Sequence, residues 1–198
     1  MSLACAKAGA AAKGIPLFQH FAELSGDFSG NFTLPMPCFN VINGGSHAGN
    51  KLAFQEYFVI PTGATSFKEA LQIGTEVYHN LKTVIKKTFG GDATLIGDEG
   101  GFAPPCDVRT GVELIMEAID KAGYQGRCTV GLDVAASEFK VEGEDAYDLD
   151  FKTKGEGKDP NSKLSTKELV RLQSRVSFVG DSLTCLCPLL RRRPCTRS

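Results

Sequence analysis

Apolar residues recur at intervals of three and four along two stretches of the chain, and this spacing predicts two amphipathic helices. The first runs from Ser66 to Lys87, where Ser66 and Glu69 have the spacing of a capping box. Thr110 with Glu113 repeats that spacing before a second apolar stripe, which ends at Gly123. Capping residues and a terminal glycine therefore set the expected ends of both helices.

Three shorter helices are predicted from composition and capping signals. Ser2–Lys13 is rich in alanine, the best helix former, and stops at Gly14. Leu17–Leu24 forms a second short helix directly after it. Ser165 and Glu168 repeat the capping pattern before a third helix near the end of the sequence. These helices flank the two longer ones.

Strand-like patterns separate the helices. Residues 31–60 are strand-like, with a dense aromatic and β-branched run at Phe54–Ile60. In Thr129–Ala135 the apolar residues alternate, which puts Gly131 and Asp133 on the opposite face of the strand from Val130, Leu132 and Val134. The pattern also allows a short strand at Tyr147–Phe151. The expected order is two strands, two helices, then a strand and a helix.

Composition narrows the class of protein. The chain has 198 residues, of which 42% are hydrophobic and 23% charged, so it can bury a core as one domain or as a domain plus a fragment. A net charge of -1 provides no overall field that attracts nucleic acid or a membrane surface. Small molecules and other protein surfaces are the expected partners, and neither nucleic acid nor a membrane is.

The sequence also predicts a cytoplasmic location. No stretch has the apolar length of a membrane span, and Lys7 and Lys13 interrupt the position where a signal peptide needs apolar residues. The seven cysteines are an odd, scattered set without the paired spacing of a zinc site or a disulfide framework. We interpret most of them as small buried hydrophobic residues.

The candidate chemistry is concentrated in LIGDEGGFAPP, Leu95–Pro105, where adjacent Asp98 and Glu99 lie between glycines. Such an exposed acid pair suits proton transfer or a metal ion, although a cluster of Gly and Asp is more often a plain turn. Two further segments favour chemistry. NVINGGSHAGNKLAFQEY (Asn40–Tyr57) lies upstream and VGLDVAASEF (Val130–Phe139) downstream, and each joins a strand-like run to polar residues.

These three segments, in this order and together with SLACAKAGAAAKGIPLFQHFAELSG at the start, resemble enolase, the phosphopyruvate hydratase of glycolysis. The resemblance covers Ser2 to about Leu172. It implies an α/β fold made of the first half of an enolase-type TIM-like barrel, preceded by the last helices of the amino-terminal α+β domain. The implied division is a helical remnant at 1–30, the half-barrel at 31–178 and a divergent, unstructured tail at 179–198.

The resemblance also implies an activity, the Mg²⁺-dependent dehydration of 2-phosphoglycerate to phosphoenolpyruvate. Asp133 matches a magnesium ligand of the family, Glu99 the general acid that assists hydroxide departure, and Glu56 its carboxylate partner. Divalent cations with hard oxygen ligands suit a reaction that adds negative charge to a carboxylate. From pattern alone, Asp133 is more often an exposed or capping residue, and Glu56 is equally well explained as a solvent-facing strand residue.

Substrate contacts are implied at three further positions. Ser46 and His47 belong to GGSHAGN, a glycine-flanked loop that closes over the substrate in the family, with His47 facing the phosphate. Gln55 matches another substrate contact, as does its neighbour Glu56. A lone histidine in a loop is more often a surface residue, and Gln55 alone is an ordinary polar strand position.

Parts of the family pattern have no counterpart in this sequence, including the base lysine, the lid serine and the SIEDP carboxylate. FVGDSLT, Phe178–Thr184, resembles a later family strand and makes Asp181 a second candidate magnesium ligand, although it arrives early in the sequence. The alternative to a lyase is therefore a non-catalytic fragment, from a truncated or aberrantly spliced form. Enolases are commonly homodimers, which makes a homodimer the expected assembly.

Overall fold

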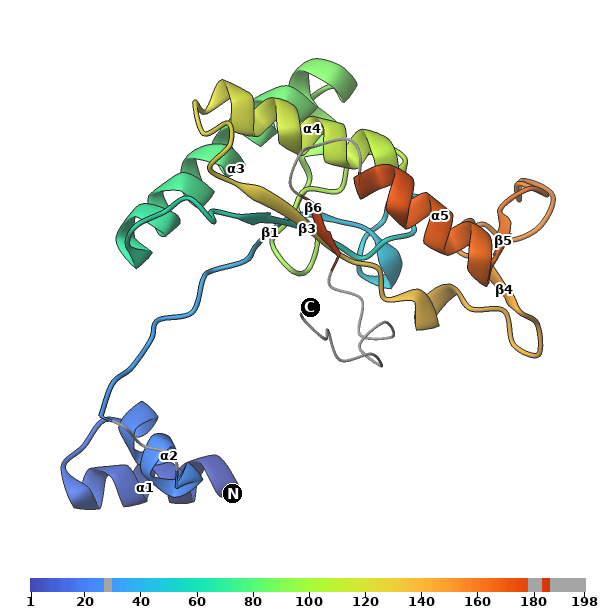
Figure 1. The fold of residues 1–198 in the computed structure, drawn as a ribbon. Coiled ribbons are helices and arrows are strands. Elements are labelled where there is room, and N and C mark those ends of the chain that lie inside the picture. Colours follow the sequence, from blue (N-terminus) through green and yellow to red (C-terminus); the bar gives the residue numbers. More distant parts are fainter. Residues whose placement is uncertain (27–29, 178–182, 186–198) are drawn as a thin grey trace, which may run out of the picture. The chain divides into compact units, whose positions relative to one another are not determined.

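The structure, a computed structural model, describes residues 1–26, 30–177 and 183–185 (Figure 1). The chain forms two compact units, Met1–Pro35 and Met36–Ser198. Among the described residues, none of the helices is both long and apolar enough to cross a bilayer.

The first unit is a pair of helices, α1 (Ser2–Lys13) and α2 (Leu17–Ser25). α1 ends at Gly14, which has the left-handed conformation that glycine adopts without strain, as the sequence predicts. His20 of α2 is buried against Gly9, where an added Cβ would lie 2.8 Å from the His20 ring. His20 is thus a packing residue, and the glycine allows the two helices to approach each other.

The second unit is built on a four-stranded sheet in the order β1-β2-β3-β6. β1 is antiparallel to β2 and β2 to β3, whereas β3 and β6 are parallel. The strands are β1 (Phe39–Asn43), β2 (Glu56–Ile60), β3 (Thr129–Asp133) and β6 (Leu183–Cys185). β6 lies in the segment for which an unstructured tail is expected, and residues 178–182 and 186–198 of the chain lie outside the described residues.

Two strand boundaries differ from the predicted ones for local reasons. The strand-like region 31–60 forms only β1 and β2, because the glycine-rich residues between them make a loop that contains the 3-10 turn η1 (Gly45–His47). β3 ends at Asp133, before the predicted Ala135, because Ala135 has a φ of 45° that no strand accommodates.

The two long helices, α3 (Phe67–Phe89) and α4 (Val108–Lys121), pack on each other and cover one face of the sheet (Figure 1). Ser66 caps α3 and accepts from the Glu69 N–H, as predicted. The predicted start of α4 at Thr110 is wrong. Asp107 is its N-cap and accepts from the Thr110 N–H at 2.7 Å, so the helix begins earlier.

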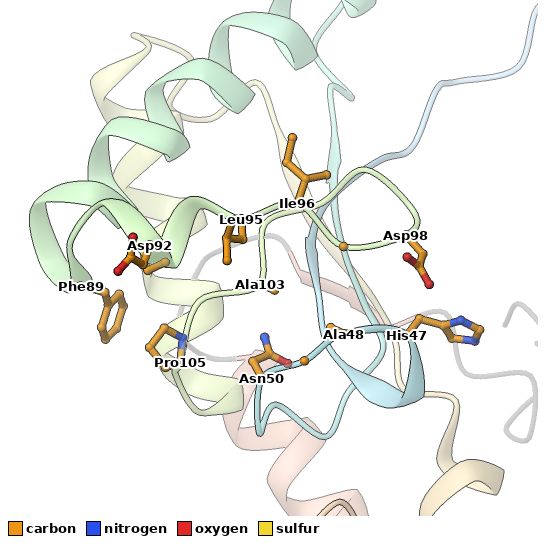
Figure 2. Close-up of a pocket in the computed structure, with 13 residues that line it drawn as sticks. His47, Ala48, Asn50, Phe89, Asp92, Leu95, Ile96, Asp98, Ala103 and Pro105 are labelled. Carbon is orange, nitrogen blue, oxygen red and sulfur yellow. The ribbon is translucent and has the colours of Figure 1, made fainter.

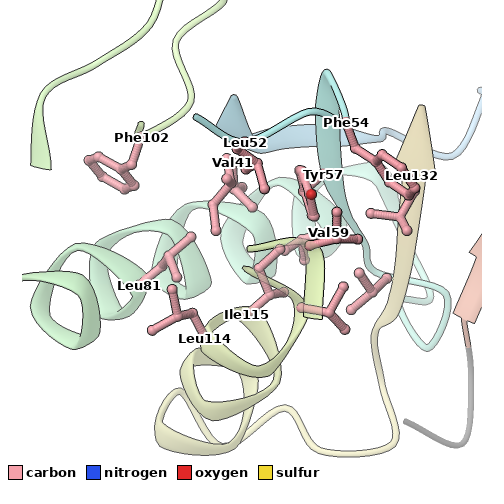
Figure 3. Packing of buried hydrophobic residues seen from close by; sticks show 14 of the residues in the cluster. Val41, Leu52, Phe54, Tyr57, Val59, Leu81, Phe102, Leu114, Ile115 and Leu132 are labelled. Atoms are coloured by element: carbon pink, nitrogen blue, oxygen red, sulfur yellow. The ribbon is translucent and has the colours of Figure 1, made fainter. Parts of the chain in front are cut away.

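The core lies between the sheet and these two helices (Figure 3). Tyr57 and Leu132 from the strands and Leu81 and Ile115 from the helices are all fully buried. Each of the three aliphatic side chains contributes about 1.5–3 kcal/mol by leaving water. This packing fixes β2 and β3, whose ends carry the candidate acids.

The remaining elements surround this core. They are η2 (Gly91–Thr94), η3 (Ala136–Phe139), the antiparallel pair β4 (Ala146–Asp148) and β5 (Lys163–Ser165), and α5 (Thr166–Ser177). The strand predicted at Tyr147–Phe151 begins one residue earlier and ends at Asp148. Ser165 and Glu168 cap α5 as predicted, since the Ser165 N–H donates to the Glu168 carboxylate at 2.8 Å.

Candidate active site

Polar residues form a row across three strands at one end of the sheet. Asn43 of β1 is the register partner of Glu56 in β2, and Glu56 is the partner of Asp133 in β3. Because β2 runs antiparallel to both neighbours, its amino end lies beside the carboxyl ends of β1 and β3. Directly opposed residues have Cβ atoms about 4.5–5.5 Å apart, so Glu56 lies next to Asp133.

Glu99 reaches this row from the loop between η2 and α4. The loop is narrow at its base, where the Gly97 N–H donates to the Gly101 carbonyl at 2.7 Å and the Gly100 N–H donates to the Gly97 carbonyl at 3.0 Å. Gly100 has a φ of 89°, a conformation that favours glycine. The turn chemistry of this glycine-rich segment therefore places Glu99 at its tip.

Three side-chain amides converge on the Glu99 carboxylate. Asn43 Nδ2 donates to Oε2 at 2.7 Å, Asn40 Nδ2 donates to the same oxygen at 3.1 Å, and Gln55 Nε2 donates to Oε1 at 3.3 Å. Asn40 Nδ2 also lies 3.5 Å from Glu56 Oε1, which links the two carboxyl groups. The structure thus brings Gln55, Glu56 and Glu99 together.

The surroundings of Glu56 change its protonation. Burial, a hydrogen bond to Glu99 and the negative charges of Glu99 and Asp133 together raise the pKa of Glu56 from 4.5 to about 7. Burial is the largest of these causes, since it disfavours the charged carboxylate. At neutral pH Glu56 therefore holds a proton for part of the time, beside a Glu99 carboxylate that accepts from three amides.

The glycine-flanked loop lies to one side of the carboxyl pair. Its Gly44 and Gly45 N–H groups donate to the carbonyls of Gln55 and Leu52 at 2.8 and 2.9 Å. Ser46 Oγ donates to Glu138 Oε2 at 2.8 Å. Ser46 is thereby joined to η3, the segment that follows Asp133 and β3.

His47 lies at a cavity of about 570 Å³ between this loop and residues 89–105. Figure 2 shows His47 and Asp98 at one end of the cavity and Phe89 and Pro105 at the other. Within the described part of the chain, no hydrogen bond joins His47 to Glu56 or Glu99. His47 and Asp98 thus line the same cavity, which places His47 near the loop 97–101 that carries Glu99, here called the acid loop. His47 does not join Glu56 and Glu99, the carboxyl pair.

Four residues of the site had no role in the sequence analysis: Asn40, Asn43, Glu138 and Lys152. Lys152 Nζ donates to the carbonyls of Ala48 and Asn50 at 3.1 and 2.7 Å, and burial lowers the pKa of its ammonium group. Asn40 and Asn43 interrupt an apolar strand, which is the signal in the sequence that points to them. Glu138 and Lys152 act through loop contacts that no local pattern reveals.

The donor atoms suit Mg²⁺ in kind, because carboxylate oxygens are the ligands that it prefers. Within residues 1–26, 30–177 and 183–185, however, no group of three or more His, Cys, Asp or Glu side chains is placed to hold a metal ion. Asp133 Oδ1 instead accepts from the Ala135 N–H at 3.1 Å. Asp181 lies outside the described residues. The described residues therefore do not form a complete metal site.

Comparison with known families gives a match over the part of the chain that contains these residues. A family model described as the C-terminal TIM barrel domain of enolase matches residues 31–180, well over half of the chain. The matched region contains the row of Asn43, Glu56 and Asp133, the Glu99 loop and the glycine-flanked loop, and in the structure this region combines strands and helices. On the strength of this match, the chain belongs to the enolase family.

Proposed function

We propose that Glu56, Glu99 and Asp133, here called the acid cluster, form the acid side of an enolase site. In this proposal the site serves the Mg²⁺-dependent dehydration of 2-phosphoglycerate to phosphoenolpyruvate. The observation that supports this is the row of Asn43, Glu56 and Asp133 across three strands, with Glu99 held over it. Sequence motifs far apart in the chain meet at this one place. Structural packing alone does not require four acids and amides to converge there.

The reaction requires a proton donor at the leaving group. A proton leaves the carbon next to the carboxylate, the carbon–oxygen bond of the neighbouring carbon breaks, and the departing hydroxide takes a proton to become water. A carboxyl group whose pKa lies near the working pH is suited to that donation. In our proposal Glu99 and Glu56 act as the pair that delivers this proton, and Glu56 holds it at neutral pH because its pKa is raised to about 7.

The other site residues have proposed roles from the family. Ser46, His47 and Gln55 contact the substrate, with His47 at the phosphate, and Asp133 is a magnesium ligand. Bound Mg²⁺ supplies positive charge that stabilises the enolate. Asp181 remains a candidate second ligand from the sequence. The described residues do not complete the metal site, so the proposed proton transfer belongs to the carboxyl pair alone.

The proposal extends to the architecture and the setting of the chain. We infer that residues 31–178 are the first half of the enolase-type barrel and residues 1–30 a helical remnant of the amino-terminal domain. A homodimer and a cytoplasmic location are proposed from the family. The isolated chain is proposed to bind substrate weakly and not to turn it over, since the base lysine of the family has no counterpart in the sequence.

Calorimetric titration of the purified chain with 2-phosphoglycerate, with and without Mg²⁺, tests the site. We expect binding that requires Mg²⁺ and that weakens at least about tenfold in Asp133→Asn, the loss typical of removing a charged contact. Asp159→Asn, an acid in the loop after β4, is the matched control and should bind as the unmodified chain does. Equal binding by both variants would contradict the proposed role of Asp133.

Absorbance of phosphoenolpyruvate tests turnover. The chain with Mg²⁺ and 2-phosphoglycerate is expected to show no increase in absorbance. An increase that disappears in Glu99→Gln would overturn the view that the isolated chain is inactive, and it would support the assignment of Glu99 as the acid.

A further inference from the structure

Asn43 uses all of its hydrogen-bonding groups to connect the parts of the site. Its backbone N–H donates to the Phe102 carbonyl at 2.8 Å, and its carbonyl accepts from Asn50 Nδ2 at 3.0 Å. Its side-chain Oδ1 accepts from the Gly101 N–H at 2.7 Å, and its Nδ2 donates to Glu99 Oε2 at 2.7 Å. The side chain is fully buried. One residue of β1 thus joins the acid loop to the glycine-flanked loop.

The orientation of the Asn43 amide is decided by the backbone. A backbone N–H can only donate, so the atom of Asn43 that faces Gly101 must be the oxygen. The amide nitrogen is then directed at Glu99, where it can only donate. The position of the acid loop therefore sets the contact with Glu99. The Asn43 amide is not free to rotate into the opposite orientation.

Two glycines of the acid loop leave the space that Asn43 occupies. A Cβ atom at Gly101 would lie 2.4 Å from Asn43 Oδ1, and one at Gly97 would lie 3.1 Å from Asn43 Cβ. The first distance is too short for any real contact, and the second requires the neighbour to move. The glycines on either side of Asp98 and Glu99 thus allow the loop to close onto Asn43.

The other donors to Glu99 are less constrained. The contacts from Asn40 and Gln55 are longer, at 3.1 and 3.3 Å, and both side chains are only half-buried, whereas Asn43 is fully buried. Water can reach half-buried donors and compete for their hydrogen bonds, so a long contact from such a donor holds its acceptor less firmly. Asn43 is the donor whose position the fold determines, and it is also the register partner of Glu56.

We propose that Asn43 is a positioning residue, which holds the Glu99 carboxylate against Glu56 through a buried amide oriented by the Gly101 N–H. The inference rests on the proposed function for its catalytic meaning, because only there does the placement of the two carboxyls matter. Without Asn43, Glu99 keeps its place in the loop and loses its fixed orientation toward Glu56.

Asn43→Asp gives the sharpest test, because it preserves size and the acceptor for Gly101 while replacing the donor with an oxygen that faces Glu99. In the metal-free chain, the pH midpoint of the Glu99 carboxyl carbon signal in NMR is expected to rise by at least about one unit, a tenfold change in proton affinity. The control is Asn161→Asp, which adds the same charge at an exposed position in the loop before β5, with an expected change of less than about threefold. Equal changes in the two variants would overturn the proposal.

Hydrogen exchange supplies a second measurement that needs no substitution at Asn43. The side-chain N–H protons of Asn43 in the unmodified chain are expected to exchange slowly with water, and at least about tenfold faster in Glu99→Ala, which removes their acceptor. An unchanged rate would contradict the contact. Protection of the Gly101 amide in Asn43→Asp shows that the loop is still folded.

These readouts involve neither metal, substrate nor turnover. A chain in which Asn43 positions Glu99 but 2-phosphoglycerate does not bind would refute the proposed function and leave the positioning role intact. A chain that binds 2-phosphoglycerate with Mg²⁺ but shows no effect of Asn43→Asp on the Glu99 pH midpoint would refute the positioning role and leave the proposed function intact.

Discussion

The two glutamates of the site, Glu56 and Glu99, lie in different electrostatic environments. Glu99 accepts from three amides, whereas Glu56 lies beside two other carboxyl groups and is partly buried. A carboxyl group in the second environment favours its protonated form. The stability of the metal-free chain should therefore depend on pH through Glu56.

The sign of this dependence follows from the direction of the shift. Folding raises the pKa of Glu56 from 4.5 to about 7, so its contribution to stability is fully present below pH 4.5 and is lost as the pH rises through 7. Glu56→Gln is expected to raise the free energy of unfolding at pH 8 by about 1 kcal/mol, a figure reduced for solvent screening, and to change it little at pH 4.5. Urea unfolding in metal-free buffer at both pH values measures this, with exposed Glu156→Gln as the control. A larger gain at pH 4.5 than at pH 8 would contradict the assignment.

The residues of the site could be predicted only in part. Glu56, Glu99 and Asp133 follow from motifs, and the structure brings them to one end of the sheet. The role of Asn43 depends on the Gly101 N–H, which lies 58 positions away in the sequence and is brought close only by the fold. No local pattern contains that contact.

Among the elements, the glycine-flanked loop is tied to the segment after β4 by one lysine. Lys152 Nζ donates to the Ala48 and Asn50 carbonyls, and no strand or helix holds those residues. Lys152→Met keeps the aliphatic stem but removes both donors, so local opening of the loop should become easier by about 1–2 kcal/mol. Faster hydrogen exchange at the Gly45 amide is the expected result, and exposed Lys154→Met is the control. Unchanged exchange at Gly45 would show that the loop is held by other contacts.

At the end of β2 and β3 that lies opposite Glu56 and Asp133, an ion pair ties the start of β3 to the start of α3. Arg127 donates to Glu69 at 2.6 Å, and hydrogen bonds from Arg127 and Thr65 lower the pKa of Glu69 from 4.5 to about 2. Because folding lowers this pKa, the stabilisation is present above pH 4.5 and is lost as the pH falls through 2. Glu69→Gln should lower the melting temperature at pH 7 and have a progressively smaller effect from pH 4.5 downward. Glu117→Gln, which removes an exposed pair with Lys121, is the control.

Helix ends show why element boundaries are only partly predictable. At α3 the capping pattern of Ser66 and Glu69 is the one used, and the predicted start is confirmed. At α4 the same pattern occurs at Thr110 and Glu113, yet Asp107 supplies the cap and Glu113 pairs with Arg109. Two capping signals three residues apart compete, and the packing of Val108 and Val112 in the core favours the earlier start.

For the molecule as a whole, one core connects the site to the helices. The buried cluster includes residues of β1, β2, β3, α3 and α4, and the acid row lies at the end of the strands that it fixes. The α/β class was predictable from the alternation of patterns, whereas the strand order was not, because pairing joins residues distant in the sequence. β2 and β3 are neighbours although 68 residues separate Ile60 from Thr129.

This connection predicts that damage to the core reaches the site. Leu132 is fully buried in β3, is the register partner of Tyr57 and directly precedes Asp133. Leu132→Ala is expected to lower the free energy of unfolding by about 3 kcal/mol, a large part of the roughly 5–15 kcal/mol of a typical domain. Leu71→Ala, at an exposed position of α3, should cost less than about 0.5 kcal/mol.

Urea unfolding followed by circular dichroism measures the core, and the Glu99 carboxyl signal in NMR measures the site in the same samples. Both signals should share one midpoint in the unmodified chain and in Leu132→Ala, because β3 carries Asp133 and belongs to the core. If the Glu99 signal were lost well before the helical signal, the site would open as a separate unit. In that case the amides around Glu99, rather than the core, would set the stability of the acid cluster.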